Sequence, residues 1–285
     1  MNSYIQKKKR VDALFKYIVM FCVAFGILML VLLLLQIFSQ GLQKLNWSFL
    51  TSFPSRMASK AGIKSALVGS VWLISTTIII ALPIGVGTAI YLEEFGGKGK
   101  MAHWIQVNIS NLAGVPSIVY GMLGLAVFVR GAGFGRSVLA GGFTLALLIL
   151  PVIVVTSQEA LKSVPKSLYQ GSLALGLTRL QTLKGVVIPY AMPSILTGSI
   201  LAISRALGEA APLIMVGAVG YVAFTPESIM DQYTALPIQI FNWTSRPQKE
   251  FQEVAAAGII VLMTLLLSFN GLAIFLRNKF QQRAE

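Results

Sequence analysis

The sequence has few of the residues that form disulfides and metal sites, and few charged residues of any kind. Its 285 residues include one cysteine, Cys22, and one histidine, His103. A single cysteine forms no intramolecular disulfide, and one imidazole without a cysteine or carboxylate cluster is a poor metal site. Charged residues make up 12% of the chain, and only 10 acidic residues stand against 23 basic ones. We expect no metal site in this chain.

A phosphate-binding loop is also missing. The glycine-rich turn at residues 131–135 follows no strand and precedes no Gly-Lys-Ser/Thr. At residues 97–100 the same test fails, because Met101 stands where a hydroxyl is needed. We therefore expect no cofactor and no catalytic residue in this chain, which is not an enzyme. If ATP powers the protein, a partner subunit binds the ATP and its Mg.

Long apolar runs dominate the sequence, in which hydrophobic residues make up 55%. Several of six such runs exceed the roughly 20 residues that cross a bilayer, and no alternating β-barrel pattern is present. Five prolines within the runs supply places to bend: Pro83, Pro116, Pro151, Pro193 and Pro212. The sequence thus predicts an all-α, polytopic helical membrane protein. The six predicted spans cover residues 17–38, 67–92, 104–129, 138–156, 186–218 and 254–276.

The basic residues predict the orientation in a plasma (inner) membrane. Residues 7–10, Lys-Lys-Lys-Arg, precede the first span and place the N-terminus in the cytoplasm. Six spans then put 14 of the 23 lysines and arginines, and both termini, on the cytoplasmic side. The net charge of +13 would also suit a nucleic-acid or anionic partner, but the excess of basic residues on the cytoplasmic side explains most of this charge. A signal peptide would begin similarly, but no small-x-small cleavage site follows, so we expect a retained span.

The loop between the fourth and fifth spans, residues 157–185, predicts two short helices. Pro165 is tolerated only in a first helical turn, so one helix begins one or two residues before it. Gly176 suits the C-terminal turn of this helix, and a second helical segment begins at Thr178. Three residues at positions i, i+4 and i+7 form one face of the first helix, and this face is available for docking: Leu168, Ser172 and Leu175.

The spacing of this loop resembles the coupling motif of ABC-importer permeases, E-A-A-x3-G-x9-I-x-L-P. Gly176 lies six positions after Gln170, nine residues follow, and residues 186–189 close the segment as Val-Val-Ile-Pro. The literal match at Glu159 has Pro165 in place of the glycine, so the spacing favours the later segment. Without the spacing, an ordinary amphipathic loop would explain these residues. The resemblance implies that a separate ATPase drives the chain through a coupling set: Gln170, Gly171, Ser172, Leu175, Gly176 and Pro189.

One charged pair lies inside the predicted fifth span. Arg205 and Glu209 are four residues apart, so they share one helical face and can pair. Charges in mid-membrane are costly, which makes this pair, with the adjacent Ser204, a candidate substrate pathway. Arg205 would supply the forked positive charge that suits an oxyanion, and Glu209 would tune or release it. Alternatively, the pair clamps neighbouring helices together and never meets substrate.

The third predicted span has a second weak point at residues 111–117. Gly114 and Pro116 interrupt helical hydrogen bonding, and the freed polar groups must face protein or a hydrated path because lipid cannot satisfy them. Asn111 and Ser117 add polar side chains, which makes both residues candidates for the pathway. Helix packing through small residues would explain the segment equally well.

Several segments together resemble the phosphate-specific ABC permeases. Residues 111–121 (NLAGVPSIVYG), residues 204–213 (SRALGEAAPL) and the coupling segment carry the resemblance. RALGE alone is shared with molybdate and sulfate permeases, and therefore implies only oxyanion import. Residues 91–95 (YLEEF) favour phosphate, and residues 236–243 (LPIQIFNW) resemble the PstA subunit rather than its PstC partner.

The resemblance implies a type I ABC importer permease fold and a function in phosphate import. The chain would divide into a cytoplasmic segment (1–16), the first helix with an outer interfacial segment (17–62), a permease core (63–276) and a cytoplasmic tail (277–285). The outer segment 219–251 would be a receptor-docking surface or a compact lid. The implied partners are a homologous second permease of the PstC type, an ATPase dimer of the PstB type, an extracytoplasmic phosphate-binding protein of the PstS type and membrane lipid, but no nucleic acid.

Three other functions compete with phosphate import. A permease for sulfate, molybdate or tungstate would share most of these features. A secondary transporter with a proton on Glu209 is a second rival, but no inverted repeat is visible and the coupling segment would be unexplained. A membrane anchor or sensor would leave the cost of burying Arg205 and Glu209 unexplained.

Overall fold

The computed structural model describes residues 2–97, 99–218 and 220–281, and every regular element in these ranges is helical. The predicted all-α class is therefore confirmed. Two of the basic residues that we assigned to the cytoplasmic side, Lys98 and Arg283, lie outside the described residues, as does the rest of the predicted tail after residue 281.

Five helices among the described residues are long and apolar enough to cross a membrane, and counting one bent pair as a span brings the number to six. Each overlaps a span predicted from the sequence. The five are α1 (Asn2–Gly41), α3 (Lys64–Ile90, continued by the π-helix η2, Tyr91–Phe95), α6 (Val138–Lys162), α9 (Ile188–Gly208) and α12 (Lys249–Gln281).

The predicted third span is a sharply bent pair of helices and not one continuous helix. α4 (Lys100–Ala113) meets α5 (Ser117–Gly124), which runs on into the π-helix η3 (Leu125–Gly131), at an angle of 112°. Pro116 causes the break: its backbone is extended (φ −58°, ψ 140°) and it has no N–H to donate.

The predicted fifth span also stops short. α9 ends at Gly208, Glu209 is extended (φ −81°, ψ 116°), and a separate helix α10 (Ala211–Val216) follows. Pro212 stands in the first turn of α10, where its missing N–H costs no helical hydrogen bond. Both breaks lie at prolines that the sequence marks as places to bend, whereas Pro83, Pro151 and Pro193 lie inside continuous helices.

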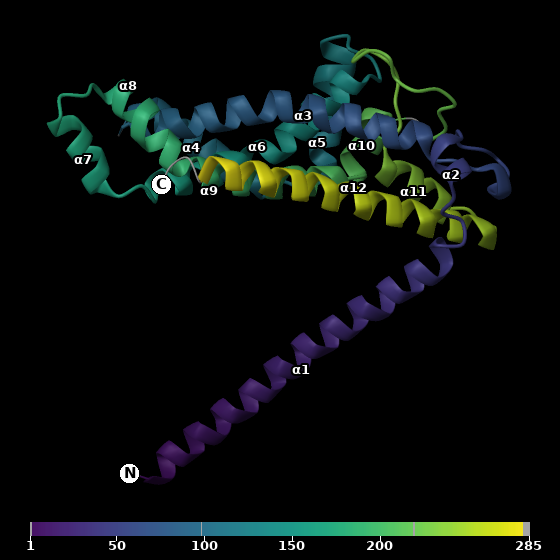
Figure 1. Cartoon of the computed structure of the whole chain (residues 1–285), viewed down its shortest axis with the longest axis horizontal. Coiled ribbons are helices and arrows are strands. Elements are labelled where there is room, and N and C mark those ends of the chain that lie inside the picture. The colour runs from purple at the N-terminus through teal and green to yellow at the C-terminus, as the bar shows by residue number, and fades with distance from the viewer. Residues whose placement is uncertain (1, 98, 219, 282–285) are drawn as a thin grey trace.

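Four long helices, α3, α6, α9 and α12, form the body of the molecule and run along its long axis (Figure 1). Small residues allow their backbones to approach closely. A Cβ added at Gly85 of α3 would lie 2.6 Å from Ile153 of α6, and one added at Gly142 of α6 would lie 2.6 Å from Thr76 of α3. Such contacts are typical of helix pairs in lipid, where van der Waals packing drives association.

α1 leaves this body at an angle and extends away from it (Figure 1). None of its 18-residue apolar window is buried within the chain. Only its C-terminal end is packed, where a Cβ added at Gly41 would lie 2.7 Å from the backbone of Ala256 in α12. The fold of this chain alone therefore leaves the apolar surface of a whole spanning helix uncovered.

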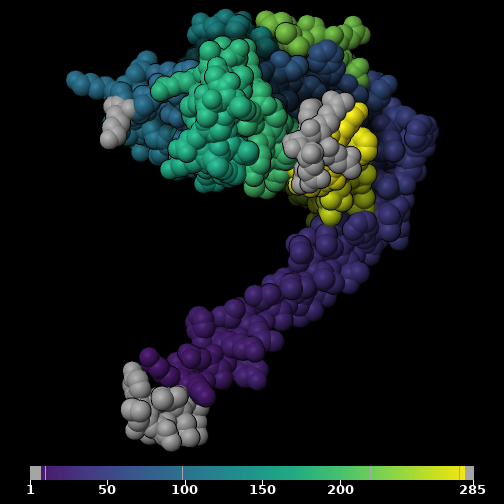
Figure 2. Space-filling view, turned by 60° about the vertical axis from the view of Figure 1, so that its left-hand side comes forward, coloured from purple at the N-terminus to yellow at the C-terminus, as the bar shows by residue number. Residues whose placement is uncertain are grey.

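The two ends of the body carry different short helices. At one end, called here the α7 end, α7 (Lys166–Ala174) and α8 (Arg179–Thr182) project beyond the long helices, in green in Figures 1 and 2. At the other, the α2 end, lie α2 (Trp47–Thr51), the 3-10 helix η1 (Ala58–Lys60) and α11 (Leu236–Thr244).

The segment before α11 enters the core at the α2 end. The N–H groups of Val138 and Leu139 donate to the carbonyls of Asp231 (3.0 Å) and Ile229 (2.8 Å). Tyr233 is then fully buried, in a slot that exists because residue 141 is glycine. This part of the predicted outer segment is thus anchored between α3 and α6.

Gly141→Ala should lower the stability of the folded chain. The added methyl group would overlap the Tyr233 hydroxyl, and overpacking a core typically costs about 1–3 kcal/mol. We expect a lower thermal unfolding midpoint in detergent. Gly26→Ala on α1, where nothing lies within 4 Å of the new methyl group, is the matched control and should keep the wild-type midpoint. An unchanged midpoint for Gly141→Ala would contradict the slot.

Candidate functional site

α9 ends at a charged pair. Arg205 lies in the last turn of α9, where the helix dipole favours a cation, and its Nε is 3.5 Å from Oε1 of Glu209. The Arg205 side chain is 57% exposed, whereas that of Glu209 is 20% exposed. The predicted pairing is confirmed, although Glu209 caps the helix from extended backbone and does not continue its face. The cation is balanced by the chain's own carboxylate and remains open on one side.

Ser204, the third predicted pathway residue of this segment, has partners within the chain. Its hydroxyl lies 2.8 Å from the carbonyl oxygen of Ile200 and 2.5 Å from Oδ1 of Asn270 in α12. The contact joins α9 to α12 directly beside Arg205. Asn270 was not among the predicted site residues. Its only signal in the sequence is a polar amide within the apolar run of the last span.

The bend between α4 and α5 lies close to the same pair. A Cβ added at Gly121 would come within 2.7 Å of the backbone of Pro212, so α5 and α10 are in direct backbone contact. Tyr120 is buried, its hydroxyl donates to the carbonyl of Leu112 across the bend (2.7 Å), and it lies within electrostatic reach of Arg205. Two backbone breaks that are distant in sequence therefore form one region.

Asn111 and Ser117, the remaining predicted pathway residues, flank this bend. Asn111 is exposed in the last turn of α4, and Ser117 begins α5, one turn before Tyr120. Among the described residues, neither side chain forms a hydrogen bond with Arg205 or Glu209. They are neighbours of the charged region and not direct partners of the pair.

The predicted helix at the α7 end forms, but it begins after Pro165 and not one or two residues before it. Pro165 is the N-cap of α7, and Gly176 follows the helix with a left-handed φ of +85°. The N–H groups of Gly176 and Leu177 donate to the carbonyls of Leu173 (3.0 Å) and Ser172 (3.2 Å), the arrangement that closes a helix on a glycine. Gly176 is thus required by the backbone conformation.

The second predicted helix also begins where the sequence indicates. Thr178 caps α8, and its side chain and that of Gln181 form a reciprocal capping box. The π-helix η4 (Leu183–Val187) then leads into α9, whose first turn contains Pro189. Two caps and a glycine therefore determine the shape of this end before any tertiary contact is considered.

The predicted docking face of α7 is only partly available. Ser172 is buried, and its hydroxyl donates to the carbonyl of Leu168 at 2.5 Å. Leu175 is 85% exposed, and Gln170 and Gly171 are exposed as well. Exposed leucines cluster on this projection, at and before the start of the spanning run Arg179–Gly208: Leu168, Leu173, Leu175, Leu177 and Leu180. An apolar surface in that position marks an interaction site.

Glu93, at the end of α3, joins three helices near α7. Its Oε1 accepts a hydrogen bond from Nε2 of Gln158 in α6 (2.8 Å) and lies 3.1 Å from Nζ of Lys162. Gln158 also donates to Gln106 of α4 (3.0 Å). Glu93 and Gln158 thus connect α3, α6 and α4 through side chains.

Glu94, the next residue, reaches α7. Both burial and the nearby Glu94 carboxylate raise the pKa of the Tyr169 hydroxyl, and Arg179 partly offsets this rise. The Tyr169 hydroxyl therefore stays protonated at neutral pH beside the Glu94 carboxylate. These residues line a cavity of about 470 Å³ between η2 and α7. Glu93 and Glu94 were not predicted as site residues, and YLEEF was used only for the family resemblance. Two adjacent acids at the end of an apolar run were nevertheless a visible signal of a site.

Residues 81–282 match the family described as binding-protein-dependent transport system inner membrane component. The chain belongs to this family. The matched region contains both backbone breaks, the Arg205–Glu209 pair and α7.

Individual permeases of the family are similar along most of the chain. A probable ABC transporter permease, YqgI of Bacillus subtilis strain 168, is 34% identical over 87% of this chain and 89% of its own length. Phosphate transport system permease protein PstA 1 of Mycobacterium tuberculosis is 34% identical over 73% of this chain and 69% of its own. PstA of Pasteurella multocida is 28% identical over 100% of this chain and 99% of its own.

Solved structures of importer permeases share the fold. A chain of a bacterial ABC transporter involved in the import of the acidic polysaccharide alginate has a TM-score of 0.67, with 14% identity over 96% of this chain and 98% of that one. A chain of the inward-facing MetNI methionine ABC transporter has a TM-score of 0.53, with 16% identity over 78% and 95%. The predicted type I importer architecture is confirmed. This permease is a multi-pass membrane transport subunit, and its family works with an ATPase and a binding protein.

Tyr169→Phe should weaken the coupling between ATP hydrolysis and transport in this permease. The change removes the hydroxyl that lies beside the Glu94 carboxylate and keeps the ring, so the polar contact between α7 and η2 is lost. We expect uptake per ATP hydrolysed to fall by about threefold or more, with the ATPase still bound. Tyr190→Phe, at an exposed position in α9, is the control. A wild-type ratio of uptake to hydrolysis in Tyr169→Phe would show that the link does not transmit motion.

Proposed function

We propose that this chain is the PstA-type permease subunit of an ATP-driven phosphate importer. The observation that carries the proposal is Arg205, a guanidinium that is open on one side where α9 breaks inside an apolar helical body. A mid-membrane cation of this kind suits an anionic substrate. The permeases named PstA are similar over most of the chain, which supports phosphate as that anion.

Arg205 has the chemistry for an oxyanion with several acceptor oxygens. The planar guanidinium donates in parallel to two oxygens, and it stays charged at any physiological pH. Glu209 balances this charge when no substrate is present, which lowers the cost of a lone ion in lipid. Arrival of phosphate replaces the carboxylate, and its departure restores the internal pair.

A second permease of the PstC type completes the pathway in this proposal. Two features of the chain alone support it: Arg205 opens away from its own protein, and α1 exposes apolar side chains along its length (Figure 1). Both surfaces need a covering protein or lipid. A related permease would supply the opposite wall of the path and contact α1.

The α7 projection is the docking site for the PstB-type ATPase dimer, which binds ATP and Mg and hydrolyses the ATP. Its exposed leucines lie at and before the start of the spanning run Arg179–Gly208, and Tyr169 lies beside Glu94 of η2. In this proposal α7, the end of α12 and both termini face the cytoplasm, and the α2 end faces a PstS-type binding protein. The basic residues at positions 7–10 support this orientation.

Uptake by the reconstituted four-component complex tests the substrate. Labelled phosphate should accumulate when ATP is supplied on the side of the membrane where the ATPase subunits lie. Excess unlabelled sulfate or molybdate should not compete with it. Competition by sulfate or molybdate at similar concentrations would move the assignment to the wider oxyanion group, whose permeases share RALGE. Uptake driven by a proton gradient without ATP would favour the secondary-transporter alternative.

Gly176→Val should uncouple transport while the chain still inserts into the membrane. A β-branched residue is strained at φ +85°, so the C-terminal turn of α7 cannot close and the leucines around it are displaced. ATP-driven uptake should fall by about tenfold or more, and ATPase co-purification should weaken. Gly185→Ala, where nothing lies within 4 Å of the added methyl group, is the control. Normal uptake together with normal co-purification in Gly176→Val would count against a coupling role.

Arg205→Gln should abolish or strongly reduce phosphate uptake without dissociating the complex. Arg205→Lys should be only partly tolerated, because an ammonium keeps the charge and loses the planar fork. The double variant Arg205→Gln, Glu209→Gln separates the two interpretations. If the pair were only a clamp, removing both charges would leave no lone ion and restore much of the uptake. Near-normal uptake in an assembled double variant would therefore refute the pathway role.

A further inference from the structure

The exposed face of α9 is polar over its last four turns, although α9 lies in a run that spans the membrane. The exposed residues there follow one another at steps of three or four, so they lie on one face: Ser194, Thr197, Leu201, Arg205 and Gly208. Leu201 is the one large apolar residue among them. The other large apolar residues of this stretch are buried or partly buried: Ile195, Leu196, Ile200, Ile203 and Leu207.

The neighbouring helix α12 has the opposite arrangement. Its exposed face carries Leu267 (64% exposed), Leu272 (58%) and Phe275 (67%), as suits a surface in contact with lipid. On α9 the same exposure falls on two hydroxyls and a guanidinium, which lipid cannot satisfy. The hydroxyl of Ser194 forms no hydrogen bond within the described chain. This face of α9 therefore needs water or polar partners beside it.

A second guanidinium lies at the far end of this face. Nη1 of Arg277, in α12, donates to Oγ1 of Thr197 (3.4 Å). Nε and Nη2 of Arg277 donate to Oδ1 of Asn278 (3.3 and 3.2 Å). Among the described residues no carboxylate forms an ion pair with Arg277. Its partners are all neutral, so its positive charge is not balanced as that of Arg205 is by Glu209.

The register between α9 and α12 places Arg277 relative to Arg205. Ser204 contacts Asn270, and Thr197 contacts Arg277, so the two contacts are seven residues apart on both helices. Thr197 precedes Arg205 by eight residues, or about 12 Å along the helix axis. The end of α12 lies beside α9 toward the α7 end (Figure 1). Arg277 is thus about two turns nearer to the proposed cytoplasmic side.

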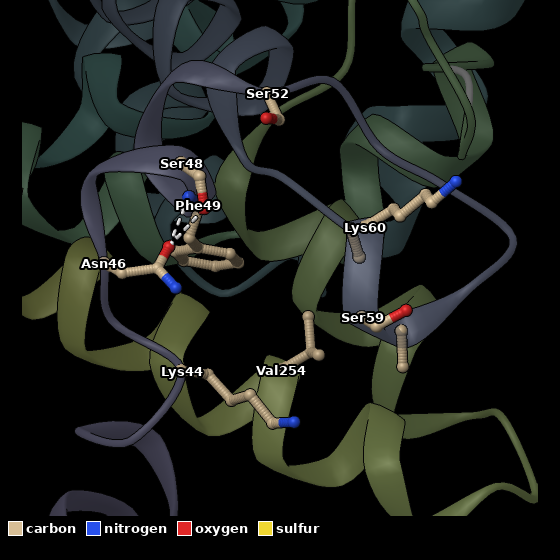
Figure 3. A pocket seen from close by; sticks show the side chains of 10 residues that line it. Lys44, Asn46, Ser48, Phe49, Ser52, Ser59, Lys60 and Val254 are labelled. Carbon is tan, nitrogen blue, oxygen red and sulfur yellow. Dashed lines mark hydrogen bonds between the residues drawn. The ribbon is translucent and has the colours of Figure 1, made fainter.

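The lysines at the α2 end are placed differently. Figure 3 shows a cavity of about 400 Å³ there, lined in part by Lys44, Asn46 and Lys60. Nζ of Lys44 is 3.3 Å from Glu253, and the Lys60 side chain points away from Asn46 (Figure 3). None of the lining residues belongs to α9. This cavity therefore does not continue the polar face of α9.

We propose that the face of α9 from Ser194 to Arg205 lines the inner half of the anion path, and that Arg277 receives the oxyanion that Arg205 releases. This inference rests on the proposed function and deepens it. Ser194 donates to the anion's oxygens near Arg277, and Thr197 holds the guanidinium against the path. No acidic residue lies on this face between the two arginines. Two cationic stations in series let an anion leave the first without being trapped there.

Cysteine accessibility in the reconstituted complex tests the inference. Cys22 is the chain's one cysteine, so Cys22→Ser gives a background for Ser194→Cys. Modification of this subunit by an anionic and by a cationic methanethiosulfonate is followed by mass spectrometry. The anionic reagent should modify Ser194→Cys about tenfold faster, or more, than the matched control Leu267→Cys, because a charged reagent is excluded from lipid. Inorganic phosphate should slow the modification of Ser194→Cys.

Arg277→Gln in the Ser194→Cys chain isolates the second cation. The rate ratio of anionic to cationic reagent should fall about tenfold, since a cationic wall concentrates anions. Lys279→Gln is the control and should keep the ratio, because Lys279 is exposed two residues further on and forms no hydrogen bond or ion pair within the described chain.

Three results would overturn the inference. The first is modification of Ser194→Cys no faster than that of Leu267→Cys, or unaffected by phosphate. The second is an equal fall of the ratio in Arg277→Gln and Lys279→Gln, which would show a general charge effect. The third is slowing by phosphatidylglycerol vesicles, relative to phosphatidylcholine, without slowing by inorganic phosphate, which would assign Arg277 to a lipid headgroup. An unreactive Ser194→Cys in a complex that imports phosphate refutes this inference alone. Arg277-dependent modification in a complex that imports another oxyanion supports it and refutes phosphate as the substrate.

Discussion

In a bilayer every backbone N–H and C=O must find its partner within the protein, and the arrangement of this permease follows from that constraint. Helices satisfy it over most of each span. The helices break at Pro116 and Pro212, although Pro83, Pro151 and Pro193 are accommodated inside helices. Both breaks are placed against one another, with Tyr120 donating across one and α5 in backbone contact with the other. The freed polar groups thereby meet protein and not lipid.

The charged pair belongs to the same region and has an uneven environment. Glu209 is largely covered, while Arg205 is open on the side away from its own chain. A helix clamp would not need an exposed guanidinium. The structure also supplies a clamp from other residues, because Ser204 and Asn270 already join α9 to α12. Because Ser204 and Asn270 already hold the two helices together, the exposed Arg205 is better explained as a pathway residue than as a clamp.

The α7 projection combines a rigid local shape with few ties to the body. Its caps and Gly176 determine its own conformation, and Tyr169 lies beside Glu94 of η2, which continues α3. From there, Glu93 and Gln158 lead to α6 and to α4, and α4 ends at the bend beside Tyr120. A continuous set of packed helices and polar contacts therefore runs from the proposed ATPase site to the charged region. Physical continuity of this kind permits coupling, and measured coupling energies decide whether it is used.

The sequence alone determined the features that depend on neighbouring residues. Apolar runs of membrane-spanning length predicted the long helices, Gly176 predicted the end of α7, and a spacing of four predicted the Arg205–Glu209 pair. Each of these rests on local geometry or composition. Only the tertiary structure decided what those elements meet. Three contacts show this, because no periodic pattern in the sequence relates their members: Tyr120 against the α4–α5 bend, Ser204 with Asn270, and Tyr169 with Glu94. The 112° angle at Pro116 is likewise set by packing, since a proline ends a helix but does not specify where the next one points.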